Sequence, residues 1–389
     1  MSEAAIVATA RTPIGTGMKG TLRDVDAYQL ATHAVSSVIE RAGLDPALYD
    51  DVVLGEQRYG GGDIARYAAI EAGLVDVPGV AHNRHCASGL TAITTAAAGI
   101  RAGMDRAVIA GGVESVSTFP MTTRRVPGTD EWDQWFPPTH ESTPDAPNMD
   151  MTITVGWNAA VEAGVTREEM DAWAYRSHQR AIAAIDEGRF VDEIAPIQVR
   201  LRDGSTTTFA VDEHPRRDTS LEKLASLKPI HPEIEGFSIT AGNACGANDG
   251  GAALVIVDDE LAASEGLDAL ATVKSWASAG VTPSRTGLAP TVAIPKALGR
   301  AGLSVQDIAL WEINEAFASM CVATTRILGI DDEIVNVEGS GCSLGHPVAM
   351  TGARMVISLV HELRRRGGGL GVAAMCAGGG MSTAVVVEV

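Results

Sequence analysis

The tetrapeptide Arg41-Ala42-Gly43-Leu44 recurs as Arg300-Ala301-Gly302-Leu303, and this repeat predicts the fold. Each copy follows a stretch with the apolar spacing of a helix and precedes an apolar stretch typical of a strand. The helical stretches are 27–40 and 291–299, and the strands are 52–54 and 308–310. A repeat of this kind indicates that one strand-and-helix unit occurs twice in the chain.

The similarity of the two halves extends to two chemically reactive residues. Cys86 lies 42 residues after Leu44, and His346 lies 43 residues after Leu303. Each is followed by an apolar helix and then a strand: 107–112 in the first half, 372–380 after the helix 351–366 in the second. We therefore expect Cys86 and His346 at near-equivalent positions, each where a strand passes into a helix.

A long insertion interrupts the first half. Its last strand, 252–257, corresponds to 383–387 of the second half but is displaced by more than a hundred residues. We assign 1–117 with 246–269 to the N-terminal half, 118–245 to an inserted loop domain, and 270–389 to the C-terminal half. The insertion contains several prolines and an amphipathic helix over 166–186. Alternating strands and helices predict an α/β core of two mainly parallel sheets with helices between them.

Composition excludes several classes of protein. The chain is 46% hydrophobic and 20% charged, which is incompatible with disorder, and its net charge of −19 disfavours nucleic-acid and membrane partners. The N-terminus lacks the basic and apolar regions of a secretory signal. Five scattered cysteines, none in Cys-x-x-Cys spacing, indicate a reducing cytoplasm and no metal site. We therefore expect a cytoplasmic protein.

Cys86 and His346 form a candidate nucleophile and base. Unpaired amides at a helix start favour a thiolate at Cys86, although a cysteine before a helix is more often a small buried apolar residue. His346 precedes Pro347, where histidine is usually structural. If the two halves bring their equivalent loops together, the imidazole can deprotonate the thiol.

Two further motifs contain candidate catalytic residues. Cys376 is followed by Ala and three glycines, whose backbone N–H groups can approach a ligand closely, as an oxyanion hole requires; a tight turn alone would also need glycine. Asn314, in Asn-Glu-Ala-Phe, can orient a water molecule or an imidazole, or simply cap the next helix.

Together these motifs resemble the thiolase family. Cys86 in Cys-Ala-Ser-Gly, Asn314 in Asn-Glu-Ala-Phe, His346 in Gly-His-Pro and Cys376 in Cys-Ala-Gly-Gly-Gly-Met have the order and spacing of that family, and 238–250 resembles a further signature. The resemblance spans essentially the whole chain. It implies a five-layer α-β-α-β-α fold with mixed sheets and an acyltransferase of fatty acid metabolism, including β-oxidation. The reaction would be thiolysis of 3-ketoacyl-CoA or Claisen condensation of acetyl-CoA.

The resemblance also implies roles for individual residues. Cys86 would take the acyl group, His346 would deprotonate it, and Cys376 would move the proton at the α-carbon. Asn314 would hold a water molecule that forms one oxyanion hole with His346, and the N–H groups of Cys86 and Gly378 would form the other. The implied substrate-binding and CoA-binding residues are Arg216, Cys245, Gly246, Met151, Thr286 and Phe317. CoA and acyl-CoA would be substrates without a permanently bound cofactor, and the protein would be a homo-oligomer, dimer or tetramer.

Departures from the family pattern predict an altered acyl pocket. Thr286 stands where short-chain members carry Met, Asp150 where they carry His, and Ala349 where the family usually has Gly. These changes favour an acyl group other than acetoacetyl. The stretch 200–228, with six cations against five acids, is a candidate for the CoA phosphates or a solvated loop.

The sequence disfavours two other functions. A ketoacyl synthase shares the duplicated fold but would have His in place of Cys376 or Asn314. A non-catalytic acyl-CoA-binding subunit would not need the complete set of Cys86, His346 and Cys376.

Overall fold

The core of the molecule is one mixed sheet made of two parts. The computed structural model describes residues 2–389, and its main sheet has the strand order β12-β13-β14-β11-β1-β10-β5-β3-β4, with β2 paired to β10. The first part contains β1 (Ala4–Arg11), β2 (Gly15–Thr16), β3 (Asp51–Gly55), β4 (Gly79–His82), β5 (Ala107–Ser115) and β10 (Asn248–Asp258). The second contains β11 (Ala271–Gly280), β12 (Leu310–Ile313), β13 (Leu370–Ala377) and β14 (Met381–Glu388).

The two parts meet at a narrow seam. Strands β1 and β11 pair only through Ala5 with Thr272 and Ile6 with Ala271. Packing between the parts is therefore left mainly to the helices that lie between them.

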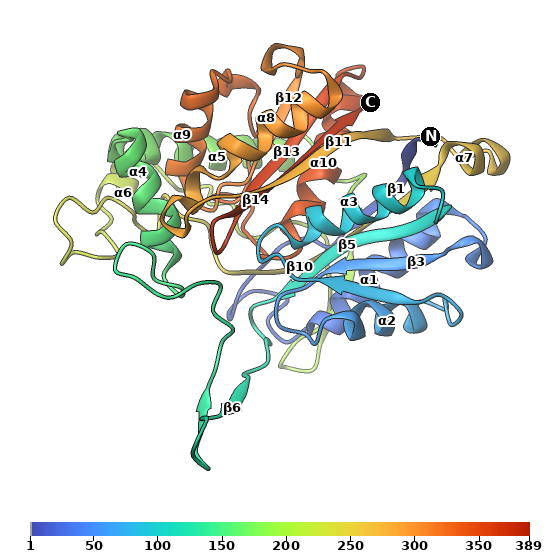
Figure 1. Cartoon of the computed structure of the whole chain (residues 1–389), viewed down its shortest axis with the longest axis horizontal. Helices are drawn as coiled ribbons and strands as arrows, with labels where there is room; N and C mark the ends of the chain where they lie inside the picture. The colour runs from blue at the N-terminus through green and yellow to red at the C-terminus, as the bar shows by residue number, and fades with distance from the viewer. Residues whose placement is uncertain (1) are drawn as a thin grey trace.

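Three helical layers alternate with the two sheet parts (Figure 1). The central helices α3 (Ser88–Arg101) and α10 (Thr351–Arg365) share one apolar cluster with both sheet parts. Helices α1 (Ala27–Ala42) and α2 (Gly62–Glu71) cover the other face of the first part. Helices α8 (Pro290–Ala301) and α9 (Ala318–Leu328) cover the other face of the second. The five-layer α-β-α-β-α arrangement expected from the family resemblance is confirmed.

The central layer depends on glycines at the crossing of α3 and α10. A Cβ atom on Gly89 would lie 2.8 Å from the Ala349 carbonyl oxygen, and one on Gly352 would lie 2.7 Å from the Leu90 nitrogen. Real Cβ atoms do not approach backbone atoms so closely, so these positions allow the two helices to touch.

The expectation of mainly parallel sheets is wrong. Among the strands of residues 2–389, only the pairs β3–β4, β3–β5 and β12–β13 are parallel, whereas the pairs that β10 and β14 make with their neighbours are antiparallel. The reason is connectivity: β13 and β14 are joined by the short turn 378–380, which can only reverse the chain, and β10 returns after the long insertion.

The segment between β5 and β10 forms small elements around one long helix. Helix α5 (Arg167–Asp186) begins at a capping box in which Thr166 and Glu169 bond each other's backbone N–H, and it packs against α9. The hairpin of β6 (Thr123–Arg125) and β7 (Trp132–Gln134) projects away from the body (Figure 1).

The other elements are short. They are a π-helix (Thr152–Trp157), α4 (Asn158–Ala163), β8 (Ile197–Arg200), β9 (Thr206–Phe209), α6 (Leu221–Ala225), α7 (Asp259–Glu265) and 3-10 turns at Pro46–Leu48, Pro283–Leu288, Val305–Asp307 and Asp332–Ile334. Across residues 2–389, no helix combines the length and apolar character needed to cross a membrane.

Candidate active site

A cavity of about 280 Å³ brings most of the predicted site residues together. Both halves of the chain and the insertion contribute to its wall. The predicted residues that line it are Cys86, Met151, Cys245, Phe317, His346, Cys376 and Gly378. Residues 260 positions apart in the sequence therefore face one space, as the equivalence of Cys86 and His346 predicts.

Cys86 lies between β4 and α3 at the wall of this cavity. Burial raises the pKa of its thiol to about 12, and the backbone N–H groups of Cys86 and Gly378, which face the sulfur, only partly oppose that rise. Burial therefore favours the protonated thiol over the thiolate expected at the helix start, because desolvation outweighs the local dipoles. The thiol needs a base.

His346 is held with one ring nitrogen free to act as that base. Its Nδ1 lies 2.7 Å from the Thr351 hydroxyl, which in turn lies 3.0 Å from the Pro347 carbonyl oxygen. A carbonyl can only accept, so the single hydroxyl proton goes to Pro347 and Nδ1 must carry its own proton. Nε2 is left with its lone pair. Burial, with a smaller effect of Arg354, lowers the pKa of His346 to about 3, so the ring is neutral.

Asn314 stands beside that free nitrogen. It follows β12 and is fully buried, with its Nδ2 3.4 Å from Nε2 of His346. Its Oδ1 has no hydrogen-bond partner among residues 2–389. A buried amide oxygen without a partner is costly, so this atom is available to a polar group of a substrate or a water molecule.

Glu315 anchors the loop that carries Asn314, and sequence reasoning gave it no role. Its fully buried carboxylate accepts hydrogen bonds from four groups, and no cation pairs with it among residues 2–389. The donors are Trp173 Nε1, Ser177 Oγ, Asn336 Nδ2 and Cys342 N, at 2.6–3.1 Å. Its place in Asn-Glu-Ala-Phe was the only signal in the sequence.

Cys376 reaches the cavity from the end of β13. Burial raises the pKa of its thiol well above the usual value, and the neighbouring Cys86 and Cys245 raise that pKa further. In the turn that follows, Gly379 has φ of +82°, and a Cβ there would lie 2.6 Å from Thr139 of the insertion. The turn therefore requires glycine at this position, while the N–H of Gly378 is the one that faces Cys86.

Three residues expected in the acyl pocket lie elsewhere. The fully buried Thr286 donates to the Pro283 carbonyl at 2.6 Å and accepts from the Gly380 N–H at 2.9 Å, so its hydroxyl holds the glycine turn. Ala349 is buried against α3. Asp150 pairs with His231 at 2.8 Å. None of these side chains lines the cavity.

The residues expected to bind CoA divide between the cavity wall and the surface. Cys245 lines the cavity, and the adjacent Gly246 lies under the ring of His214, which would be 2.3 Å from a Cβ at this position. Two residues after His214, Arg216 is exposed and makes no ion pair among residues 2–389. Three other cations of 200–228 are neutralised in the pairs Arg202–Asp24, Arg217–Asp186 and Lys223–Asp218.

Several cavity residues were not anticipated from the sequence. Gln57 and Arg58, from the loop after β3, line the cavity together with His85 and with Phe136 of the insertion. The positive φ of His85, +47°, is uncommon for a residue other than glycine. No periodicity marks these positions, and only adjacency to Cys86 could have drawn attention to His85.

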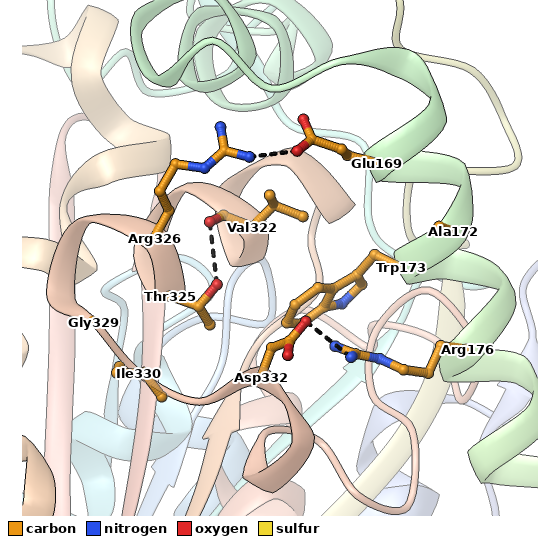
Figure 2. A pocket seen from close by; sticks show the side chains of 10 residues that line it. All are labelled: Glu169, Ala172, Trp173, Arg176, Val322, Thr325, Arg326, Gly329, Ile330 and Asp332. Carbon is orange, nitrogen blue, oxygen red and sulfur yellow. Dashed lines mark hydrogen bonds and ion pairs between the residues drawn. The ribbon is translucent and has the colours of Figure 1, made fainter.

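A larger hollow of about 560 Å³ lies between α5 and α9 (Figure 2). Its charged groups are largely satisfied within the chain, because Arg326 pairs with Glu169 and Arg176 pairs with Asp332. No cysteine or histidine lines it, so it offers neither nucleophile nor base. Trp173, in the wall of this hollow, donates a hydrogen bond to Glu315.

Comparisons with known proteins cover the whole chain. The family model "Thiolase, N-terminal domain" matches residues 4–260, and "Thiolase, C-terminal domain" matches residues 267–389. An acetyl-CoA acetyltransferase of Pseudomonas aeruginosa is 41% identical, covering 100% of this chain and 99% of its own. A beta-ketoadipyl-CoA thiolase of the same organism is also 41% identical, with 99% of each covered.

Solved structures agree. The human mitochondrial 3-ketoacyl-CoA thiolase in complex with CoA superposes with a TM-score of 0.89 at 34% identity, covering 100% of this chain and 98% of the other.

Proposed function

The chain belongs to the thiolase family, and we propose that it catalyses the reversible CoA-dependent thiolysis of 3-ketoacyl-CoA through an acyl group on Cys86. One observation carries the assignment of residues: Cys86, His346 and Cys376 line one cavity, and the hydrogen bonds of His346 leave its Nε2 unprotonated. A protonated thiol, a neutral base and a second thiol are what this reaction requires.

In the first step, His346 Nε2 takes the Cys86 proton as the sulfur attacks the keto carbon of the substrate. Negative charge develops on the keto oxygen, and the N–H groups of Cys86 and Gly378 stabilise it there. These groups already face the sulfur, so they need little rearrangement.

In the second step, the bond between the α-carbon and the keto carbon breaks. The acyl group stays on Cys86, and acetyl-CoA leaves as an enolate that takes the Cys376 proton. Charge on the thioester oxygen is stabilised beside Asn314 and His346, where the Asn314 Oδ1 is free to fix a water molecule.

The last step returns all protons. The Cys376 thiolate takes the proton of a second CoA thiol, whose sulfur attacks the acyl group on Cys86. The leaving sulfur of Cys86 takes back the proton held by His346. Condensation of acetyl-CoA with an acyl group is the same sequence reversed.

We place the CoA-binding residues on the side of the cavity formed by Cys245. Gly246 and His214 continue this wall outward to the exposed Arg216, a cation without an acidic partner among residues 2–389. A guanidinium there can pair with a CoA phosphate. Met151 and Phe317 line the cavity and would contact the acyl or pantetheine chain.

We also propose that the segment 118–245 mediates self-association into a homo-oligomer. The hairpin β6–β7 projects from the body (Figure 1), and its Trp132 is 67% exposed. Light scattering of the protein with and without residues 123–134 tests this, because loss of the hairpin should lower the molar mass.

Two measurements test the reaction and the nucleophile. Thiolysis is followed as loss of the 3-ketoacyl-CoA absorbance on addition of CoA, with Cys86→Ala as the matched control. Mass spectrometry after incubation with acetyl-CoA should find the acetyl group on Cys86. An adduct on Cys376 alone would reverse the two assignments, and absence of thiolysis with any 3-ketoacyl-CoA would reject the function.

A further inference from the structure

Arg58 is a cation in the active cavity without an internal partner. It lies in the loop between β3 and α2 and lines the same space as Cys86. Its guanidinium makes no hydrogen bond or ion pair to any group among residues 2–389. Most other arginines near the centre of the molecule are paired, as Arg11 is with Glu193 and Asp212.

Two aromatic rings hold this guanidinium in place. It lies 4.4 Å from the centre of the Phe119 ring and 4.1 Å from that of Phe136, both from the insertion. Contacts with ring faces fix the position of an arginine without using its N–H groups, which lie in the guanidinium plane. Arg58 is thus oriented, and its N–H groups are left for another acceptor.

Glu114 acts on the charge of Arg58 from a distance but forms no ion pair with it. Glu114 is buried, and burial raises its pKa to about 7. Burial with so little compensation lowers the pKa of Arg58. A partly buried cation without an ion-pair partner is stabilised when it binds an anion.

Gln57 and His85 lie beside Arg58 in the cavity wall, and Thr139, Asn148 and His346 are further polar residues that line it. The Gln57 Nε2 lies 3.3 Å from His85 Nδ1, and His85 is close enough to Arg58 for the cation to help lower its pKa. By contrast, Met149, Met151, Val155, Phe317 and Val348 give much of the remaining wall an apolar surface. The cavity therefore combines an apolar surface that suits methylene groups with one cation, Arg58.

We propose that the acyl pocket takes 3-ketoacyl-CoA substrates whose acyl chain ends in a carboxylate, and that Arg58 determines this specificity. The proposal rests on the thiolase function above and adds the substrate class. The apolar wall contacts the methylene groups, and the guanidinium binds the terminal carboxylate through two parallel N–H donors.

A CoA phosphate is the other anion that could reach Arg58. The geometry favours the acyl carboxylate, because Arg58 lies in the cavity wall beside Gln57 and His85, whereas the proposed CoA residues continue outward from Cys245 through Gly246 to Arg216. The two sources are separable, since a pantetheine thioester carries the acyl group without the nucleotide phosphates.

The experiment measures kcat/KM for thiolysis of matched substrates of four to eight carbons, each with either a methyl or a carboxylate terminus. The wild-type protein should favour the carboxylated member of at least one pair. In Arg58→Leu that ratio should fall about tenfold to a hundredfold, the effect of losing charge-assisted hydrogen bonds. Arg58→Lys should keep part of the preference because it keeps the charge.

Arg124→Leu is the matched control. Arg124 also contacts an aromatic ring of the insertion, Trp135, but it is exposed, pairs with Asp133 and does not line the cavity. The substrate ratio should not change in this variant. Thermal unfolding of all variants separates misfolding from altered specificity.

Three outcomes would overturn the proposal. One is a wild-type preference for the methyl-terminated member at every length, with robust thiolysis showing that the thiolase function itself stands. The second is an equal loss for both members of each pair in Arg58→Leu. The third is an effect of Arg58→Leu that disappears with pantetheine thioesters, which would assign Arg58 to a CoA phosphate. A carboxylate preference that persists with pantetheine thioesters supports the proposal.

Discussion

At the scale of single residues, the hydroxyl of Thr351 decides which nitrogen of His346 can accept a proton. Thr351→Val keeps the shape of the side chain and removes the acceptor for the Nδ1 proton. Because that bond strengthens when the ring becomes charged, kcat/KM for thiolysis should fall about tenfold to a hundredfold.

Thr351→Ser is the control, because it keeps the hydroxyl and should remain close to wild type. The pH profile of Thr351→Val should also change, since the imidazolium loses a partner. An unchanged rate and profile in Thr351→Val would show that the hydroxyl does not position the ring.

The protonation of Cys86 gives a second prediction at this scale. Because burial raises the pKa of its thiol to about 12, the thiolate fraction should grow about tenfold for each pH unit from 7 to 10. The rate of alkylation of Cys86 by iodoacetamide, mapped by mass spectrometry to separate Cys245 and Cys376, should rise accordingly. A plateau below pH 8 would instead indicate a thiolate stabilised in the free protein.

Cys376→Ser separates the two thiols. A serine hydroxyl has far too high a pKa to exchange the proton at the α-carbon, whereas Cys86 and His346 remain intact. The variant should still form the acetyl adduct on Cys86 but lose carbon–carbon bond formation and cleavage. Condensation of acetyl-CoA at a near wild-type rate would exclude Cys376 as the acid and base.

At the scale of helices and strands, the contact between α3 and α10 connects stability to catalysis, since Cys86 precedes one helix and His346 the other. In Gly352→Ala the new Cβ would press on the Leu90 backbone and separate the helices. We expect a loss of about 1–3 kcal/mol in the free energy of unfolding and a lower kcat. Denaturant titration and thiolysis assays measure both effects.

Gly299→Ala is the matched control for that variant. Gly299 is also inside a helix, α8, but no atom lies within 4 Å of a Cβ added there. This substitution should be neutral or stabilise the protein by up to about 1 kcal/mol. Similar losses in both variants would mean that the contact between α3 and α10 has no special role.

Elements with strong local signals were predictable from the sequence. The helices 27–42, 167–186 and 351–365 follow apolar spacing and end signals, and the structure places them within a few residues of the expected bounds. Strand direction was not predictable in the same way, because it depends on where β10 and β14 return. The local sequence of a strand does not determine the direction in which it joins the sheet.

In the candidate site, only the residues that belong to sequence motifs were predictable. Cys86, His346 and Cys376 reach one cavity as expected, but Thr286 does not, because its hydroxyl is used by the Gly380 N–H. Arg58 was missed because its environment consists of Phe119 and Phe136, which are distant in sequence. The expectation of an acyl group other than acetoacetyl is therefore better supported by Arg58 than by Thr286.

At the scale of the whole molecule, each half supplies an incomplete site. The first half contributes Cys86 and the N–H that faces its sulfur, and the second contributes His346, Cys376 and the Gly378 N–H. The proposed catalysis therefore requires the two halves to be held in register, and α3 and α10 provide the shared packing.

Because the seam between β1 and β11 is narrow, the packing of α3 and α10 against both sheet parts can hold that register without the peptide bond that joins the halves. A gene encoding residues 1–268 and another encoding 269–389 should thus yield a working two-piece enzyme when expressed together, since the break falls in a partly exposed loop and leaves α3 and α10 whole. Co-purification through a tag on one piece, with thiolysis by the pair and by neither piece alone, is the expected result. If the pieces never associate, the intact chain is needed to assemble the halves, and two separate pieces cannot reconstitute the enzyme.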